Sequence, residues 1–339
     1  MLQSKNWSNK FRKLFYATIL LTGVLTLCSW GYWGHQHINK AAIFALPDEM
    51  RRFFYNHADF ITEESGVPDI RKHTYNFKTE VPRHYIDIEA FDKSVDSLPR
   101  APKEAYEAYK DSFLQKNGSL PWYIQEMTAK LTTAFKQKRK TEILLLASDL
   151  GHYLGDANMP LHTNLNHDGQ LSGQTGIHAF WEAQLPEMFG DKYNLYTGNA
   201  KYIDDVTKET WRIIKHTHQL ADSVLLIEKR LRANYKPEQM YQLDSNGVIL
   251  KNKFNQPIHT DEYARKFHEA LNGMIEEQIR LSISATADFW YTAWVNAGKP
   301  NLSTLDAPEL TSGNKKNYTR DFTAWKKGKV TNLKIDNEF

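Results

Sequence analysis

The segment at residues 141–162, TEILLLASDLGHYLGDANMPLH, decides the fold class of this chain. Its apolar residues are dense from Thr141 to Leu154, as expected for a helix that is buried on most sides. His152 and Asp156 stand four residues apart in this helix, so their side chains lie on one face and can share one metal ion. The segment therefore predicts a central buried helix that carries part of a functional site.

The rest of the chain has the pattern of a predominantly helical protein. Apolar residues recur at helical spacing over most of residues 30–296, and no long alternating run predicts a sheet. Further helices are expected over residues 38–45, 48–60, 121–131, 202–232 and 261–295. Residues 237–259 are expected to form a loop with room for a short hairpin, because they contain turn-forming residues. The predicted fold class is all-α.

Length and composition bound the organisation of the chain. Its 339 residues are 41% hydrophobic and 24% charged, an ordinary globular composition that excludes disorder for most of the chain. A formal net charge of +3 is too small to indicate a nucleic-acid or membrane partner by itself. We expect one folded domain over residues 30–299 and a polar, basic tail over residues 300–339 that is solvated and dispensable for catalysis.

Residues 1–29 have the pattern of a secretory signal peptide. Four basic residues precede an apolar run at residues 14–27, which is shorter than the about 20 residues of a membrane span. Export to the periplasm or the medium is therefore expected. Anchoring by lipid at Cys28 is a weaker alternative, because bulky Leu27 stands where a small residue normally precedes the modified cysteine. Cleavage after Ser29 would leave a mature chain that begins at Trp30 and has no cysteine.

Histidine and carboxylate residues predict a metal site without sulfur ligands. The chain has 13 histidines and one cysteine, and zinc accepts imidazole and carboxylate ligands when no thiolate is available. His178 and Glu182 repeat the spacing of His152 and Asp156, with His162 between the two pairs. One such pair alone would be an ordinary helix-surface ion pair. Two pairs around a further histidine favour metal binding.

Further candidate ligands lie on either side of a predicted turn and at the start of the mature chain. Asp69 follows a loop-like segment, and His84 follows Pro82 on a short extended or turn segment. His35 lies five residues after Trp30, whose free α-amino group could bind a metal once deprotonated. Asp149, one turn before His152, is a candidate hydrogen-bond partner for that imidazole.

These motifs, taken in order, resemble the superfamily of zinc-dependent phospholipases C and S1/P1-type nucleases. The resemblance spans about residues 30–182 and rests on Trp-x-x-x-x-His, His-Tyr-x-Gly-Asp-x-x-x-Pro-x-His and His-x-x-x-acid. It implies a multi-helix single domain with a cleft that holds three zinc ions. The implied ligands are Asp69, His84, His152 and Asp156 for the first ion, His162, His178 and Glu182 for the second, and Trp30 and His35 for the third.

The resemblance also implies the chemistry. Asp156 would bridge the first and third ions, and Asp69 would orient or deprotonate the attacking water as well as bind metal. The expected reaction is hydrolysis of a phosphodiester by in-line attack of a zinc-bound hydroxide, without a covalent intermediate. The expected enzyme is a monomer that needs no protein partner.

The branch of the superfamily is indicated by a few residues. Glu182 and the absence of cysteine from the mature chain are similar to the phospholipase C branch, which the sequence therefore favours. Tyr85, directly after His84, stands where the nucleases carry an aromatic residue that stacks on a base. A single-strand nuclease that releases 5′-nucleotides is therefore the alternative. A secreted helical binding protein with structural zinc is a third hypothesis, but a three-ligand set with an open position favours an enzyme.

Overall fold

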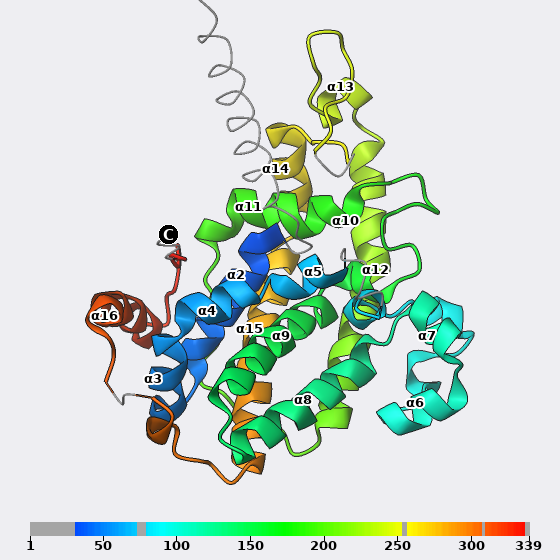
Figure 1. The fold of residues 1–339 in the computed structure, drawn as a ribbon. Helices are drawn as coiled ribbons and strands as arrows, with labels where there is room; N and C mark the ends of the chain where they lie inside the picture. The colour runs from blue at the N-terminus through cyan, green and yellow to red at the C-terminus, as the bar shows by residue number, and fades with distance from the viewer. Residues whose placement is uncertain (1–30, 73–78, 253–255, 307–308, 336–339) are drawn as a thin grey trace, which may run out of the picture.

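The computed structural model describes residues 31–72, 79–252, 256–306 and 309–335 (Figure 1). Helices dominate these parts of the chain, and extended pairing within them is limited to isolated bridges. The predicted all-α fold is therefore confirmed. Within the described residues, no helix has both the length and the apolar character needed to cross a membrane.

The structure contains α-helices distributed along the whole described chain. They are α2 (Gly31–Ala45), α3 (Asp48–Asn56), α4 (Ala58–Glu64), α5 (Val67–Lys72), α6 (Pro102–Ala108), α7 (Asp111–Asn117), α8 (Leu120–Lys136), α9 (Lys140–Ala157), α10 (Ile177–Ala179), α11 (Leu185–Phe189), α12 (Val206–Arg232), α13 (Pro237–Met240), α14 (Asp261–Ala270), α15 (Met274–Asn296) and α16 (Ser312–Lys326). Short helical turns relevant to the site are η1 (Val81–His84), η4 (Pro160–Thr163) and the π-helical η5 (Phe180–Gln184).

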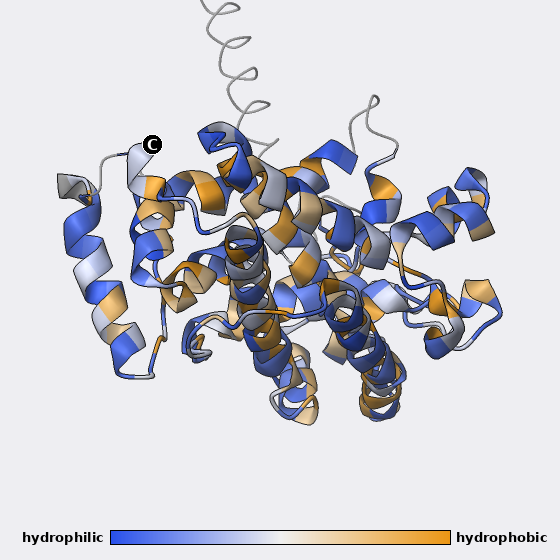
Figure 2. Cartoon of the chain, turned by 90° about the horizontal axis from the view of Figure 1, so that it is seen from below, coloured by the Kyte–Doolittle hydropathy of each residue, from blue (hydrophilic) through white to orange (hydrophobic). Residues whose placement is uncertain are grey.

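Helix α9 is the predicted central helix, and it contacts α2, α4, α8 and α15 (Figure 1). Leu150 and Leu154 of α9 are fully buried. The ring of Trp290 on α15 is also buried, and its Nε1 donates a 2.9 Å hydrogen bond to the Ala147 carbonyl. Figure 2 shows apolar and polar residues alternating along the surrounding helices, which is the amphipathic pattern that such packing requires. The core therefore forms around the segment that carries His152 and Asp156.

Two glycines of α9 allow α2 to approach closely. A Cβ atom on Gly151 would lie 1.9 Å from Oδ1 of Asn39 on α2, and one on Gly155 would lie 3.1 Å from Nδ1 of His35. Asn39 Nδ2 donates a 3.1 Å hydrogen bond to the Ser148 carbonyl across this contact. The glycine at every fourth position thus places His35 directly against the helix that carries the other candidate ligands.

Several predicted elements differ in extent from those observed. The helix expected over residues 48–60 is two helices, α3 and α4, which meet at His57. The 237–259 segment begins with α13 and then forms the expected hairpin, with antiparallel bridges between Tyr241 and His259 and between Leu243 and Ile249. The signal peptide and Trp30 lie outside the described residues.

The expectation of a solvated C-terminal tail is wrong. Residues 312–326 form helix α16, and Trp325, Val330 and Leu333 are buried. The carbonyl of Leu333 accepts a 2.9 Å hydrogen bond from His37 Nε2, so the C-terminal segment contacts α2. The sequence does not indicate a packed segment here, because its few aromatic and aliphatic residues stand among many lysines. The domain boundary at residue 299 stays a prediction, but the segment after it packs against the helices before it.

We predict that Trp325→Ala destabilises the protein by about 3–5 kcal/mol, the usual cost of deleting a buried tryptophan ring. Trp325 is 3% exposed, and its ring lies 5.0 Å from that of Tyr196 and 6.0 Å from that of Phe44, measured between centroids. Urea unfolding measures the loss. Exposed Lys326 is the matched control, and Lys326→Ala should stay within about 0.5 kcal/mol of wild type. Equal stability of both variants would restore the solvated-tail hypothesis.

Candidate metal centre

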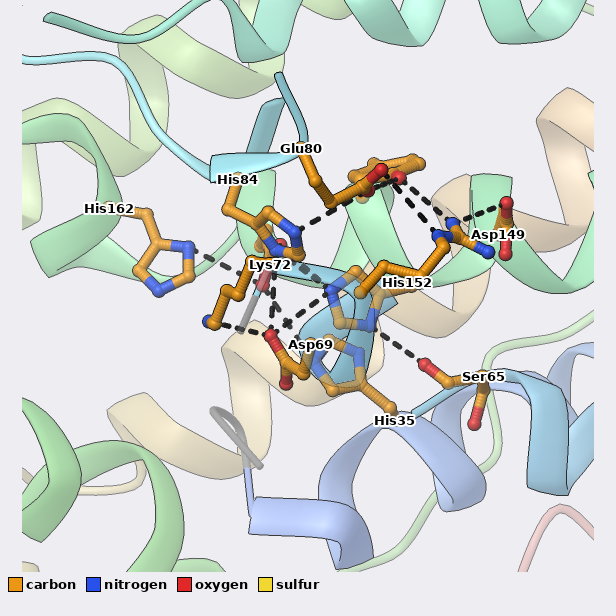
Figure 3. Close-up of polar contacts among 12 residues, drawn as sticks. His35, Ser65, Asp69, Lys72, Glu80, His84, Asp149, His152 and His162 are labelled. Carbon is orange, nitrogen blue, oxygen red and sulfur yellow. Dashed lines mark hydrogen bonds and ion pairs between the residues drawn. The ribbon is translucent and has the colours of Figure 1, made fainter. Parts of the chain in front are cut away.

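Seven separate elements bring the candidate ligands of the described residues together. His35 comes from α2, Asp69 from α5, His84 from η1, and His152 from α9. Figure 3 shows these side chains turned toward one another, with His162 from η4 beside them. His35, Asp69, His84 and His152 are almost completely buried.

The first group contains Asp69, His84, His152 and Asp156. His84 Nδ1 lies 2.9 Å from Asp156 Oδ2, and His152 Nε2 lies 3.2 Å from the same oxygen. Asp69 Oδ1 is 3.6 Å from His84 Nδ1 and 3.7 Å from His152 Nε2. Ligands about 2.0–2.2 Å from a tetrahedral zinc ion lie roughly 3.3–3.6 Å from one another. The spacing of these four donors is therefore close to that of a zinc site.

The second group contains His162, His178 and Glu182. Glu182 Oε2 lies 2.7 Å from His178 Nε2 and 3.4 Å from His162 Nε2, and the two Nε2 atoms are 3.2 Å apart. Glu182 is carried by the π-helical turn η5, an irregularity that is frequent at functional sites. These three donors can hold one ion and leave a coordination position open.

Asp156 lies between the groups. Its Oδ2 faces His84 and His152, whereas its Oδ1 is 3.7 Å from His35 Nε2 and 3.4 Å from His162 Nδ1. The ring of His35 stacks on that of His152 with centroids 3.8 Å apart. The two carboxylate oxygens therefore face different sets of donors, which is the arrangement that a bridging ligand needs. Trp30, the other predicted ligand of the third ion, is outside the described residues.

Unpaired polar atoms test whether the residues fit metal ions. Among the described residues, both ring nitrogens of His35, His162 Nδ1, Asp156 Oδ1 and both carboxylate oxygens of Glu182 form no hydrogen bond, although several of them lie within ion-pair distance of one another. Buried polar atoms are normally hydrogen-bonded because desolvation without a partner is costly. Three sets of closely spaced donors also occur here, namely His35, His152 and Asp156; Asp69, His84 and His152; and His162, His178 and Glu182. Nitrogen and carboxylate oxygen donors in this number suit zinc.

The electrostatics of the site keep its carboxylates ionised. Burial would raise the pKa of Asp156, but His152 and His162 hold it well below its usual range. Burial likewise opposes ionisation of Glu182, yet His178 and His162 lower its pKa to about 2. Burial lowers the pKa of His35 to about 3, so that imidazole is neutral and able to bind a metal.

Backbone carbonyls orient two of the imidazoles. His152 Nδ1 lies 2.7 Å from the Ser65 carbonyl, and His178 Nδ1 lies 3.2 Å from the His167 carbonyl. Each contact directs Nε2 toward the carboxylates. The prediction that Asp149 is the partner of His152 is wrong. Asp149 accepts a 2.6 Å hydrogen bond from Arg71 instead, and the Ser65 carbonyl takes the Nδ1 edge of His152.

Two charged residues that sequence reasoning missed lie in the site. Lys72 Nζ is 2.7 Å from Asp69 Oδ1, and Glu80 Oε1 is 3.6 Å from His84 Nε2. Burial lowers the pKa of the Lys72 ammonium, but Asp69 reverses this effect and raises it overall. Both pairs have helical spacing, i to i+3 and i to i+4. That spacing was a signal in the sequence that could have found them.

Tyr85 follows His84 into an extended segment beside the site. The Ile86 amide donates a 2.9 Å hydrogen bond to the His162 carbonyl, and the Tyr85 hydroxyl donates one of 2.9 Å to the Lys116 carbonyl. Side chains two residues apart lie on the same side of an extended chain, so Asp87 shares a side with Tyr85. Asp87 is 6% exposed, and its Oδ1 has no hydrogen-bond partner among the described residues.

We predict that Asp87→Asn stabilises the protein at pH 8 but not at pH 4. Burial, assisted by Glu89, raises the pKa of Asp87 to about 7, above its ordinary value of about 3.9. Because the fold favours the neutral carboxyl, wild type loses stability as pH rises through this interval. The melting temperature of the variant should therefore rise above that of wild type between pH 4 and pH 7 and stay higher above pH 7. Exposed Asp222 is the control, and Asp222→Asn should follow wild type at every pH.

A protein-family model matches most of the chain. A model of the S1/P1 nuclease family matches residues 30–283, which is well over half of the chain. The matched range contains every candidate ligand from Trp30 to Glu182 and all of helix α9. A search of curated proteins found no match.

Proposed function

The chain belongs to the S1/P1 nuclease family, and from this premise we propose that it is a zinc-dependent phosphodiesterase that cleaves single-stranded nucleic acid. Membership of the family implies a metal-dependent phosphodiester hydrolase. The observation that carries zinc as the metal is the set of buried histidine and carboxylate donors at ligand spacing, several of them without a hydrogen-bond partner. Zinc and the nucleic-acid substrate are the parts that need an experiment.

Each residue of the site has its own role in hydrolysis. Bound divalent ions lower the pKa of water toward neutrality and neutralise charge on the phosphate. Asp69, kept ionised by Lys72 at 2.7 Å, accepts a hydrogen bond from the attacking water and orients it toward phosphorus. The Lys72 ammonium adds positive charge where the phosphodiester oxygens approach. Asp156 fixes the relative position of the donor groups through its two oxygens.

Tyr85 and Asp87 support a nucleic-acid substrate. A tyrosine ring next to His84 offers a stacking surface for a base, and base stacking on aromatic rings is a general means of binding single strands. Asp87, on the same side of the segment, has an unpaired carboxyl oxygen that could accept or share a hydrogen bond with a base edge. A hydrogen-bonding group beside an aromatic ring suits a nucleobase, which has both a flat face and a polar edge.

Phospholipid is the alternative substrate, which the sequence alone favoured. Besides Glu182 and the cysteine-free mature chain, two aliphatic residues next to the site are exposed, Ile70 at 40% and Val81 at 39%. They directly follow Asp69 and Glu80, and exposed aliphatic side chains near a site suit acyl chains. A purely structural zinc protein is less favoured, because the three-donor group at His162 leaves a position open.

Parallel incubation with single-stranded DNA and with phosphatidylcholine vesicles tests the substrate. We expect mononucleotides from DNA and no phosphocholine from the vesicles. Tyr85→Ala should raise KM for DNA by about tenfold, the effect of losing about 1.4 kcal/mol of stacking, while hydrolysis of bis(p-nitrophenyl) phosphate is unchanged. Tyr106→Ala is the matched control, since Tyr106 is exposed and lies on α6. Release of phosphocholine alone would establish the phospholipase alternative.

Export through the N-terminal segment is part of the same proposal. If the α-amino group of Trp30 is a metal ligand, any residues ahead of it would remove that amine from the site. We therefore predict that the exported protein begins at Trp30 and carries no lipid, as measured by intact mass. A lipidated Cys28 on a fully active enzyme with three zinc ions would contradict the terminal-amine ligand. It would leave His84, His152, Asp156, His162, His178 and Glu182 in place.

A further inference from the structure

Glu80 is a buried carboxylate that contacts the metal centre from outside the ligand groups. It is 1% exposed and lies four residues before His84, at the start of the turn that carries this histidine. Figure 3 shows its carboxylate on the far side of the His84 ring from Asp69. The position of Glu80 needs an explanation, because buried carboxylates are rare unless they are paired.

The two ring nitrogens of His84 face different partners. Nδ1 lies 2.9 Å from Asp156 Oδ2 and 3.0 Å from His152 Nε2, so it points into the donor group. Nε2 points away from that group, and Glu80 Oε1 lies 3.6 Å from it. Among the described residues, Nε2 has no other hydrogen-bond partner. An imidazole that binds metal through Nδ1 carries its proton on Nε2, and this proton needs an acceptor.

A network of charges and a hydroxyl group fixes the carboxylate of Glu80. Tyr153, the neighbour of His152, donates its hydroxyl hydrogen to Oε1. Arg83 donates a 2.9 Å hydrogen bond to Oε2, and Arg71 Nε lies 3.5 Å from the same oxygen. Arg71 in turn donates to Asp149 at 2.6 Å and to the Tyr153 hydroxyl at 3.3 Å. Asp149 thus acts on the site through Arg71 rather than through His152.

A simple ion-pair role for Glu80 accounts for less of this geometry. Arg71 already has Asp149 as a partner, and the Arg83 side chain is 29% exposed and can be solvated. Neither arginine requires a fully buried carboxylate. The orientation of Oε1 toward the unpartnered edge of His84 is the feature that an ion pair alone leaves unexplained.

We propose that Glu80 is a positioning residue, which accepts a hydrogen bond from His84 Nε2 and holds Nδ1 toward the metal. The 3.6 Å separation closes to a hydrogen bond with a small turn of the ring when Nδ1 binds an ion. This inference rests on the proposed function, since it presumes that the first donor group binds zinc.

Zinc affinity measured on the whole mature protein tests the role of Glu80. Protein is equilibrated with buffers of graded free zinc, and bound zinc is counted. Glu80→Gln and Glu80→Asp should each raise the free zinc needed to fill one ion position by about 10–100-fold and leave the others unchanged. Glu80→Asp keeps the charge that Arg71 and Arg83 face but withdraws it from His84. Its zinc-free form should therefore lose less stability than that of Glu80→Gln, which removes the charge.

A double-mutant cycle separates positioning from general stabilisation. In a His84→Ala background, Glu80→Gln should have no further effect on zinc binding, because its target is gone. Glu142→Gln is the matched control, since Glu142 pairs with Arg139 on the surface and should change nothing. A change of less than about twofold in Glu80→Gln, or an equal loss with and without His84, would overturn the proposal. Failure of wild type to bind any zinc would instead overturn the proposed function.

Discussion

Replacing Asp156 with asparagine is expected to lower kcat/KM for bis(p-nitrophenyl) phosphate by at least about 10³-fold. The two oxygens of Asp156 face different donors, Oδ2 toward His84 and His152 and Oδ1 toward His35 and His162. Asparagine is nearly isosteric but removes the negative charge. Loss of about 4 kcal/mol of transition-state stabilisation, within the range that metal ions supply, corresponds to this factor. Steady-state kinetics at saturating zinc measure it.

The control is Asp222→Asn, a change of the same type at an exposed position on α12, which should keep wild-type activity. The zinc content of Asp156→Asn should also fall, because the Asp156 side chain belongs to more than one of the donor groups. Activity of Asp156→Asn within about tenfold of wild type would remove Asp156 from the centre of the mechanism. The orientation of its two oxygens toward different donors would then reflect side-chain packing and not metal binding.

Removal of metal is expected to have the second large effect. A strong chelator should abolish hydrolysis and lower the melting temperature, and zinc should restore both. Bound ions should stabilise the fold, because the carboxylates of Asp69, Asp156 and Glu182 are buried and lie in closely spaced donor groups that an ion would join. One ligand present at a thousandfold excess over its Kd adds about 4 kcal/mol of stability, or roughly 6 °C for a protein of this size.

Differential scanning calorimetry with and without chelator measures the stability term, and the same samples give the activity. The readouts separate the hypotheses. Loss of both, with recovery in zinc, is the expected result. Loss of stability with no hydrolysis under any condition would favour the binding protein with structural zinc. Full hydrolysis in the presence of chelator would contradict a metal-dependent reaction.

Local spacing made part of the site predictable. His152 with Asp156 and His178 with Glu182 stand four residues apart, and helix geometry alone turns each pair to one face. The central helix was predictable for the same reason, since its apolar residues are continuous in sequence. The structure brings His35, Asp69, His84 and His162 to these pairs, as the resemblance implied, but no local pattern could show it.

Features that depend on packing between distant segments could not be predicted. Proximity in sequence predicts Asp149 as the partner of His152, but Asp149 accepts its hydrogen bond from Arg71 on another helix. The contact of α2 with α9 depends on Gly151 and Gly155, whose meaning appears only when the two helices are packed. The C-terminal helix is hard to predict because its short buried face stands among many exposed lysines. In each case a long-range contact overrode the local pattern.

The central claim is that these buried donors hold the zinc ions of a phosphodiester hydrolase. Anomalous diffraction from crystals of the exported protein, recorded at the zinc absorption edge, tests it most directly. We predict three peaks, each about 2 Å from its donors. The donors are Asp69, His84, His152 and Asp156 for one peak, His162, His178 and Glu182 for another, and His35, Asp156 and the N-terminus for the third. Zinc peaks only on the protein surface, or none at all, would contradict the account.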